Sequence, residues 1–288
     1  MKKIVTFILL LSMVFTFSAC GKVEITMQEI YDANQTEALL KNHQIVYIRD
    51  EMDGEFFSER YLTKEYAYNY VPGSDKESDW AEFMTDDAYY CYMGGDYLRY
   101  LSISPDGVSD FASYRAEHYA AVTLGVDVLN DTIESVTKKD GRITVKSVSD
   151  QEALAEFGMA SAKSEYALDA KTREIISVIS DFTYDDGTAF GSLTEVTYDA
   201  EVPELLKTFM EYENQTENLR NVTVVSNPGI ENEKTESVQV PKGLIIGFEY
   251  DDALAYVPEF YTDAACTESY DPYADTDSDL TIYVKWTE

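Results

Sequence analysis

Thiol and imidazole side chains together can carry nucleophilic catalysis, the thiol as nucleophile and the imidazole as its base. The sequence holds three cysteines and two histidines. Cys91 and His118 could form a thiolate and its base, because such partners meet in space rather than in sequence. Cys91 lies among tyrosines with no catalytic motif around it, which favours the alternative of a buried core cysteine. His43 follows a predicted helix, whose C-terminal dipole would favour a cation there.

Motifs of known enzyme classes are missing from the sequence. Neither histidine belongs to an HExxH motif, and no GxSxG, Walker or GxGxxG motif occurs. We therefore predict a protein that is not an enzyme and that uses no cofactor.

Aspartates near the C-terminus are the candidate ligands for a hard cation such as calcium. They are spaced along one short segment: Asp271, Asp275, Asp277 and Asp279. An EF-hand loop beginning at Asp275 needs glycine at its sixth position and glutamate at its twelfth, where this chain has Leu280 and Trp286. We predict no metal centre here; a weak surface calcium site and an acidic loop before the last strand are the remaining alternatives.

The first twenty residues have three parts. Lys2 and Lys3 are followed by the apolar run Ile4–Phe17, and small residues precede Cys20. This order resembles a bacterial lipoprotein signal. The resemblance implies that residues 1–19 are removed, that Cys20 carries a thioether-linked diacylglycerol, and that residues 20–24 form a lipidated tether. Two acyl chains would hold the protein stably on the extracytoplasmic face of a Gram-positive-type cell membrane.

An ordinary secretory signal with a chance cysteine is the alternative. A transmembrane helix is disfavoured, because the apolar run is shorter than the ~20 residues that span a bilayer.

Acidic side chains outnumber basic ones, with 54 Asp and Glu against 22 Lys and Arg and a formal charge of −32. Loss of residues 1–19 would remove two lysines and no acid, which changes the charge to −34. This charge disfavours nucleic acid and an anionic membrane surface as partners, because both would repel the protein.

With Cys20 assigned to lipid, Cys91 and Cys266 are predicted to be free thiols, with a disulfide between them as the alternative.

A capping box, Thr26-Met27-Gln28-Glu29, predicts a helix that runs to about Lys41. After it, short aromatic and β-branched runs with a period of two are separated by turn signals, which predicts an antiparallel meander. Its strands are expected at Gln44–Asp50, Glu55–Leu62, Glu65–Val71, Trp80–Met84, Asp87–Met93 and Asp96–Ile103.

The alternation breaks at Ser109–Asn130, which we interpret as a flap or plug of one or two short helices. Helices are predicted further on at Gln151–Phe157 and Val202–Glu213, and the polar stretch Asn214–Asn218 is the best candidate for a linker. The strands between the flap and that linker are expected at Ile133–Val136, Ile143–Val148, Lys163–Leu168, Glu174–Tyr184 and Leu193–Tyr198.

Tyrosines alternate along two of the predicted strands, at Tyr66–Tyr70 and at Tyr90–Tyr92, so each set lies on one face. The apolar segment Tyr119–Leu129 would be costly to expose, which predicts that it covers the sheet. An apolar ligand would then be held between the cover and the tyrosines. The candidate ligand-binding residues are Tyr68, Tyr90, Tyr92, Tyr119, Val122 and Leu124.

Residues 25–213 show an order of elements that is known from one protein family: a helix, a meander, a flap and then the hairpin Ser164–Ile176. They resemble the half-barrel fold of lipoprotein carriers and their Gram-positive, lipid-anchored relatives. The resemblance implies a strongly curved sheet around a hydrophobic cavity, which helices cover and which holds acyl chains or other apolar ligands. A filled core with no ligand is the alternative that the same pattern allows.

A second resemblance to a known family lies in the C-terminal part of the chain. It rests on Phe260–Thr267 and Thr276–Thr287, and on the predicted strands Val222–Val225 and Ser237–Pro241 that precede them. Residues 219–288 resemble a Listeria–Bacteroides repeat, the B-repeat of internalin-like surface proteins. Members usually have Gly-Trp where this chain has Glu259-Phe260. The resemblance implies a small β-grasp-like module that serves as a spacer or a binding unit.

We therefore predict an α+β protein, mostly antiparallel β, with a curved half-barrel sheet at 25–213, a linker at 214–218 and a β module at 219–288. The predicted function is that of a membrane-anchored extracytoplasmic lipoprotein, non-catalytic, which binds a hydrophobic small molecule or lipid. The alternative is a cell-surface interaction protein, in which the half-barrel is a scaffold and the tail contacts a protein or glycan.

Overall fold

The computed structural model describes residues 24–75, 77–122, 128–250, 256–273 and 276–287. These residues are mostly antiparallel β-strand, as the sequence predicts, and they form two compact units. The first unit consists of the described residues of 1–33 and 124–189. The second consists of those of 34–123 and 190–288.

The first unit contains an antiparallel sheet of four strands and two short helices. Helix α2 (Met27–Ala33) begins at the predicted capping box, where Thr26 N donates to Glu29 Oε2 at 2.8 Å and Glu29 N donates to Thr26 Oγ1 at 3.1 Å. Helix α5 (Gln151–Glu156) begins at Asp150, whose carboxylate accepts from two backbone N–H groups. The strands follow one another in the sheet: β8 (Thr132–Lys139), β9 (Arg142–Val148), β10 (Met159–Asp169) and β11 (Ile175–Tyr184), and the 3₁₀ helix η1 (Val128–Asn130) precedes them.

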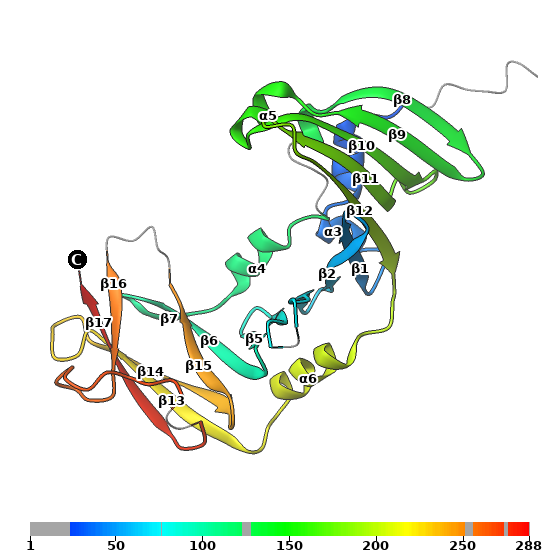
Figure 1. Cartoon of the computed structure of the whole chain (residues 1–288). Coiled ribbons are helices and arrows are strands. Elements are labelled where there is room, and N and C mark those ends of the chain that lie inside the picture. The colour runs from blue at the N-terminus through cyan, green and yellow to red at the C-terminus, as the bar shows by residue number, and fades with distance from the viewer. Residues whose placement is uncertain (1–23, 76, 123–127, 251–255, 274–275, 288) are drawn as a thin grey trace, which may run out of the picture. The chain divides into compact units, whose positions relative to one another are not determined.

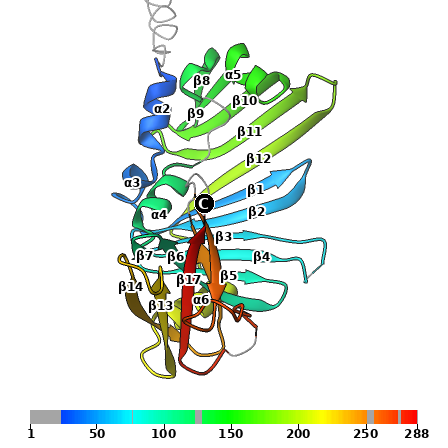
Figure 2. The same ribbon diagram turned by 90° about the vertical axis from the view of Figure 1, so that its left-hand side faces the viewer.

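The second unit is built on a large curved sheet that does not close (Figure 2). Its neighbours pair antiparallel except at the last pair, β6 and β15, which run parallel. Strand β7 (Gly107–Ser109) forms a hairpin with β6. The strand order is β12 (Ala189–Tyr198), β1 (Val46–Met52), β2 (Glu55–Leu62), β3 (Ala67–Val71), β4 (Trp80–Met84), β5 (Tyr89–Met93), β6 (Asp96–Ser104) and β15 (Ile245–Glu249).

Three helices belong to the second unit: α3 (Thr36–Leu39), α4 (Ala112–His118) and α6 (Glu204–Glu213). The prediction of one helix from Thr26 to Lys41 is wrong, because the chain leaves the helical path at Asn34 and Gln35. Asn34 O accepts from Val122 N at 3.3 Å, and Thr36 N donates to Ala120 O at 3.0 Å. These backbone bonds to a distant segment replace the bonds that a continuous helix would make.

The C-terminal residues form a second sheet of four strands within the same unit. Strands β13 (Leu219–Ser226) and β17 (Leu280–Thr287) lie side by side in parallel, flanked by β14 (Lys234–Pro241) and β16 (Val257–Tyr261). The predicted β-grasp-like fold of this tail is not confirmed. Strand β15 leaves the tail to extend the large sheet (Figure 1), so the division at residues 214–218 stays a prediction.

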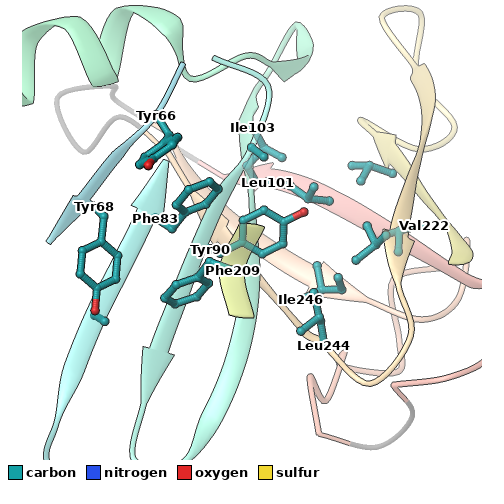
Figure 3. Packing of buried hydrophobic residues seen from close by; sticks show 14 of the residues in the cluster. Tyr66, Tyr68, Phe83, Tyr90, Leu101, Ile103, Phe209, Val222, Leu244 and Ile246 are labelled. Atoms are coloured by element: carbon teal, nitrogen blue, oxygen red, sulfur yellow. The ribbon is translucent and has the colours of Figure 1, made fainter. Parts of the chain in front are cut away.

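One hydrophobic core lies between the large sheet and the C-terminal sheet. It joins side chains of β3 to β6, helix α6, β15 and the C-terminal strands. This core is continuous between the two sheets (Figure 3). It contains Leu101 and Ile103 of β6 and Ile246 of β15 from the large sheet, and Val222 of β13 from the C-terminal sheet. The hairpin of β10 and β11 forms as predicted, with Asp169 N donating to Glu174 O at 2.9 Å across the turn.

Candidate ligand-binding site

The tyrosine face of the large sheet, defined by Tyr68, Phe83 and Tyr90, is a filled core. The register places Tyr68 of β3 beside Phe83 of β4, and Phe83 beside Tyr90 of β5. Phe209 of α6 packs against all three rings, with centroid distances of 6.2, 5.9 and 6.3 Å (Figure 3). Tyr68 is 1% exposed and Phe209 is 0% exposed. Helix α6 therefore occupies the space in which the sequence predicts a ligand.

Tyr92 lies on the same face as Tyr90 and is half-buried beside Tyr97, at a ring distance of 5.0 Å. Tyr119 belongs to the opposite face of the sheet, because it bonds to Glu82, the neighbour of Phe83 in β4. Val122 is fully buried next to Asn34. Leu124 and Cys20 lie outside the described residues. Tyr68, Tyr90 and Tyr92 thus lie on one face of the sheet, and Tyr119 lies on the other.

The face opposite the tyrosines contains a buried carboxylate, Glu82, which is 2% exposed. Its oxygens accept from the hydroxyls of Tyr89, at 3.1 Å, and of Tyr119, and from Asn69 Nδ2 at 3.4 Å. Burial, and then the charge of Glu82, raises the pKa of both tyrosines well above the usual range. The two neutral tyrosine hydroxyls therefore supply hydrogen-bond donors to the buried carboxylate of Glu82. The bond from Tyr119 also joins the segment after α4 to the sheet.

A groove of about 710 Å³ opens on this second face. Its floor consists of Leu40, Leu62 and Ala67, all nearly fully buried, and Leu62 and Ala67 are direct neighbours in the register of β2 and β3. Helices α3 and α4 and the turn between β2 and β3 form its walls. The lining residues are Gln35, Thr36, Glu37, Leu40, Lys41, Leu62, Thr63, Lys64, Ala67, Arg115, Ala116, Tyr119 and Ala120.

Backbone and side-chain bonds hold the walls of the groove together. Thr36 Oγ1 donates to Tyr119 O at 2.6 Å, which joins the start of α3 to the end of α4 (Figure 2). Arg115 donates from Nε and Nη2 to Asp86 Oδ1 at 2.8 and 2.5 Å. The same Nη2 lies 3.5 Å from Lys64 O, so α4 is also tied to the turn between β2 and β3.

A second recess, of about 490 Å³, lies beside β6, β7 and β14. Acidic side chains dominate its charged lining, with Asp87, Asp110 and Glu236 against the single cation Arg99. Glu236 is already engaged, because its Oε2 accepts from Val108 N at 2.5 Å. Burial lowers the pKa of Arg99, whose guanidinium also lies over the ring of Tyr90. The groove on the other face suits an apolar ligand better.

Cys91 and His118 occupy separate environments. Cys91 is buried on β5 against Leu98 and Ile245, and burial followed by the charge of Glu82 raises its pKa to about 12. His118 is exposed at the end of α4, where it stacks on Tyr114. A thiol with this pKa is protonated near neutral pH and is then a poor nucleophile. Of the two alternatives for Cys91, the buried core cysteine therefore fits the structure better. Cys91 and Cys266 are free thiols in the structure.

The aspartates of the C-terminal loop make local hydrogen bonds. Asp279 accepts from Asn221 N at 2.7 Å and from Asn221 Nδ2 at 3.2 Å, and Asp271 accepts from Tyr273 N at 3.0 Å. Asp275 lies outside the described residues. Among the residues that the structure describes, no group of three or more His, Cys, Asp or Glu side chains could hold a metal ion.

Neither the buried carboxylate of Glu82 nor the groove is predicted above from the sequence. A glutamate within the apolar strand Trp80–Met84 is a signal that could have indicated a buried carboxylate. The groove has no comparable signal, because its lining comes from three segments that are far apart in the sequence.

No protein-family model matches the chain, and no curated protein matches it. Among solved structures, the crystal structure of S. cerevisiae core factor aligns over 59% of this chain and 33% of its own, with 10% identity and a TM-score of 0.14. The alignment thus spans about one third of that protein, and a TM-score this low carries no argument about fold or function. Among the described residues, no helix has the length and apolar character needed to cross a membrane.

Proposed function

We propose that this protein is a lipid-anchored, extracytoplasmic lipoprotein that binds a hydrophobic or lipid-like ligand in the groove, without covalent chemistry. The observation that carries the proposal is the groove of about 710 Å³ with its floor of buried apolar side chains. Small-molecule sites in proteins are clefts of roughly 300–1,000 Å³ with the same combination of apolar lining and a few polar groups. The anchoring part of the proposal rests on the likeness of residues 1–20 to a lipoprotein signal.

Burial of ligand surface against the apolar part of the groove lining would supply the binding free energy. Each buried methylene contributes ~0.8 kcal/mol, so a chain of about ten methylenes gives a gross value of roughly 8 kcal/mol. The loss of ligand freedom reduces this value, so we expect dissociation constants of about 1 µM or weaker.

Filling the groove tests this proposal. Ala116 is an exposed groove residue on α4, and Ala116→Trp would place an indole in the space of the ligand. Ala155→Trp, at an exposed alanine of α5 in the first unit, is the matched control. Protein made without residues 1–20 is titrated with a fluorescent fatty acid. We expect Ala116→Trp to weaken binding by about tenfold or more, roughly 1.4 kcal/mol, and Ala155→Trp to leave it unchanged.

Unchanged binding by Ala116→Trp would mean that the ligand sits elsewhere. If no folded form of the protein binds the fatty acid, ligand binding itself is wrong.

A cell-surface interaction protein is the second candidate function. It is favoured by the filled tyrosine face, in which Phe209 leaves no room for a ligand, and by the core that the C-terminal sheet shares with the large sheet. In this case the large sheet is a scaffold, and residues 219–288 contact a protein or glycan. Well-folded protein that contains no co-purified lipid and binds no fatty acid would support this second candidate.

A further inference from the structure

The groove is cationic in a strongly acidic protein. The whole chain has 54 acidic and 22 basic side chains, whereas the lining of the groove has one carboxylate, Glu37, and three cations, Lys41, Lys64 and Arg115. The charge balance of the lining is therefore the reverse of that of the chain. A ligand with a negative charge would be attracted here and repelled by most of the remaining surface.

The three cations differ in how far they are already neutralised. Arg115 is held by Asp86, through two donors on one carboxylate oxygen. Lys41 pairs with Glu37 at 3.4 Å, but the two side chains are 68% and 89% exposed, so this pair is weak. Lys64 is exposed, and it makes no ion pair or side-chain hydrogen bond within the described part of the chain. Lys64 is thus the cation most available to a ligand.

Arg115 lies beside the turn that contains Lys64, since Arg115 Nη2 reaches the carbonyl oxygen of Lys64. The floor residues Leu62 and Ala67 lie at the ends of β2 and β3, on either side of the turn that contains Lys64. A molecule with one charged end and one apolar end would match this arrangement.

Uncharged polar groups of the groove are already engaged. Thr63 Oγ1 donates to Tyr66 O and accepts from the N–H groups of Glu65 and Tyr66. Thr36 Oγ1 donates to Tyr119 O, and Tyr119 Oη donates to Glu82. The protons of these hydroxyls are already donated, so a headgroup that needs donors finds them mainly in the ammonium group of Lys64, and an anion makes the stronger bond to it.

We infer that the groove binds a single-chain amphiphile with an anionic headgroup, its acyl chain on Leu40, Leu62 and Ala67 and its anion beside Lys64. This inference rests on the proposed ligand-binding function and adds the class of the ligand. A fatty acid has this chemistry.

Three amphiphiles with the same chain length and different headgroups test the inference. Dodecanoate, dodecanol and dodecylamine compete for the groove against the neutral fluorescent probe N-phenyl-1-naphthylamine, with protein made without residues 1–20. A hydrogen bond to a charged group contributes ~1.5–3 kcal/mol, so dodecanoate should compete about tenfold or more better than dodecanol. Dodecylamine should be the weakest competitor.

Variants locate the headgroup. Lys64→Gln should reduce the preference for dodecanoate over dodecanol to about threefold or less and leave the affinity for dodecanol unchanged. Glu37→Gln should increase the preference, because it removes the partner of Lys41. Lys139→Gln removes the same charge from an exposed strand residue of the first unit and should change nothing.

Equal competition by all three amphiphiles, or a preference for dodecylamine, overturns the inference and leaves the proposed function standing. A preference for dodecanoate that persists in Lys64→Gln overturns the placement of the anion. If the folded protein binds neither the probe nor any amphiphile, the proposed function fails together with the inference.

Discussion

Replacing Phe209 with alanine should destabilise the second unit strongly. The side chain projects from α6, is fully buried, and stacks on Phe83 with an interplanar angle of 6° and a centroid distance of 5.9 Å. It also contacts Tyr68, Tyr90 and Tyr97, the last in an edge geometry at 5.8 Å. Truncation would leave a cavity that four aromatic rings line.

The magnitude follows from this burial. Truncation of a fully buried phenylalanine to alanine costs ~3–5 kcal/mol, and the lost aromatic pairs place Phe209 toward the upper part of this range. Such a loss is a large part of the ~5–15 kcal/mol that stabilises an ordinary domain. For a unit of this size it corresponds to a fall in the melting temperature of roughly 6–20 °C.

Urea unfolding followed by circular dichroism measures the loss, with thermal unfolding as a second readout. Phe157→Ala is the matched control, because Phe157 is 57% exposed at the end of α5. We expect the control to change the free energy of unfolding by less than ~0.5 kcal/mol. A loss below ~1 kcal/mol for Phe209→Ala would refute the assignment of α6 as the filling of the tyrosine face.

Phe209→Ala also separates the tyrosine face from the groove. If the groove binds the ligand, the folded variant should bind fluorescent fatty acid as the unaltered protein does, because Phe209 does not line the groove. A marked gain or loss of binding would indicate that the ligand occupies the tyrosine face.

Three other changes have defined outcomes. Cys20→Ser should move the protein from the detergent phase to the aqueous phase, because the thioether acceptor is lost, and unchanged partitioning would contradict lipidation. Burial raises the folded-state pKa of Tyr89 and Tyr119 above 10, so the stability that they contribute is complete below pH 10 and is lost as the pH rises further. The melting temperature of Tyr119→Phe should therefore fall less between about pH 9 and pH 11 than that of the unaltered protein. An equal fall in both proteins would refute this expectation. Proteolytic cleavage within Asn214–Asn218 should give fragments that do not unfold cooperatively alone, because the two sheets share a core; two cooperative fragments would instead support the predicted domain boundary.

Local features of the fold could be predicted from adjacent residues. The turns at Asp53-Gly54 and Asp140-Gly141 have positive φ at both positions, as two-residue hairpins require, and Asp-Gly is a residue pair that favours this turn. The capping box at Thr26 forms as expected, and Asp150, directly before α5, caps that helix. Each of these features depends on groups within a few residues of one another, so the local sequence contains the information that decides it.

The two faces of the large sheet could be predicted, but not what covers each of them. Alternation places Tyr68 and Tyr90 on one face, and it carries no information about α6, which follows them by more than a hundred residues. The segment at Tyr119, which the sequence assigns as a cover for these tyrosines, lies on the other face because its hydroxyl reaches Glu82.

Pairing between distant segments was decided by tertiary structure alone. The sequence of β15 reads as a short apolar run, and nothing in it specifies a parallel pairing with β6. The predicted helix to Lys41 is interrupted because Asn34 and Thr36 find backbone partners at Val122 and Ala120. Composition and alternation thus determined a strand-rich, acidic protein. The groove exists only because α3, α4 and the turn after β2 meet in space, and contacts of this kind depend on shape and packing rather than on any local pattern.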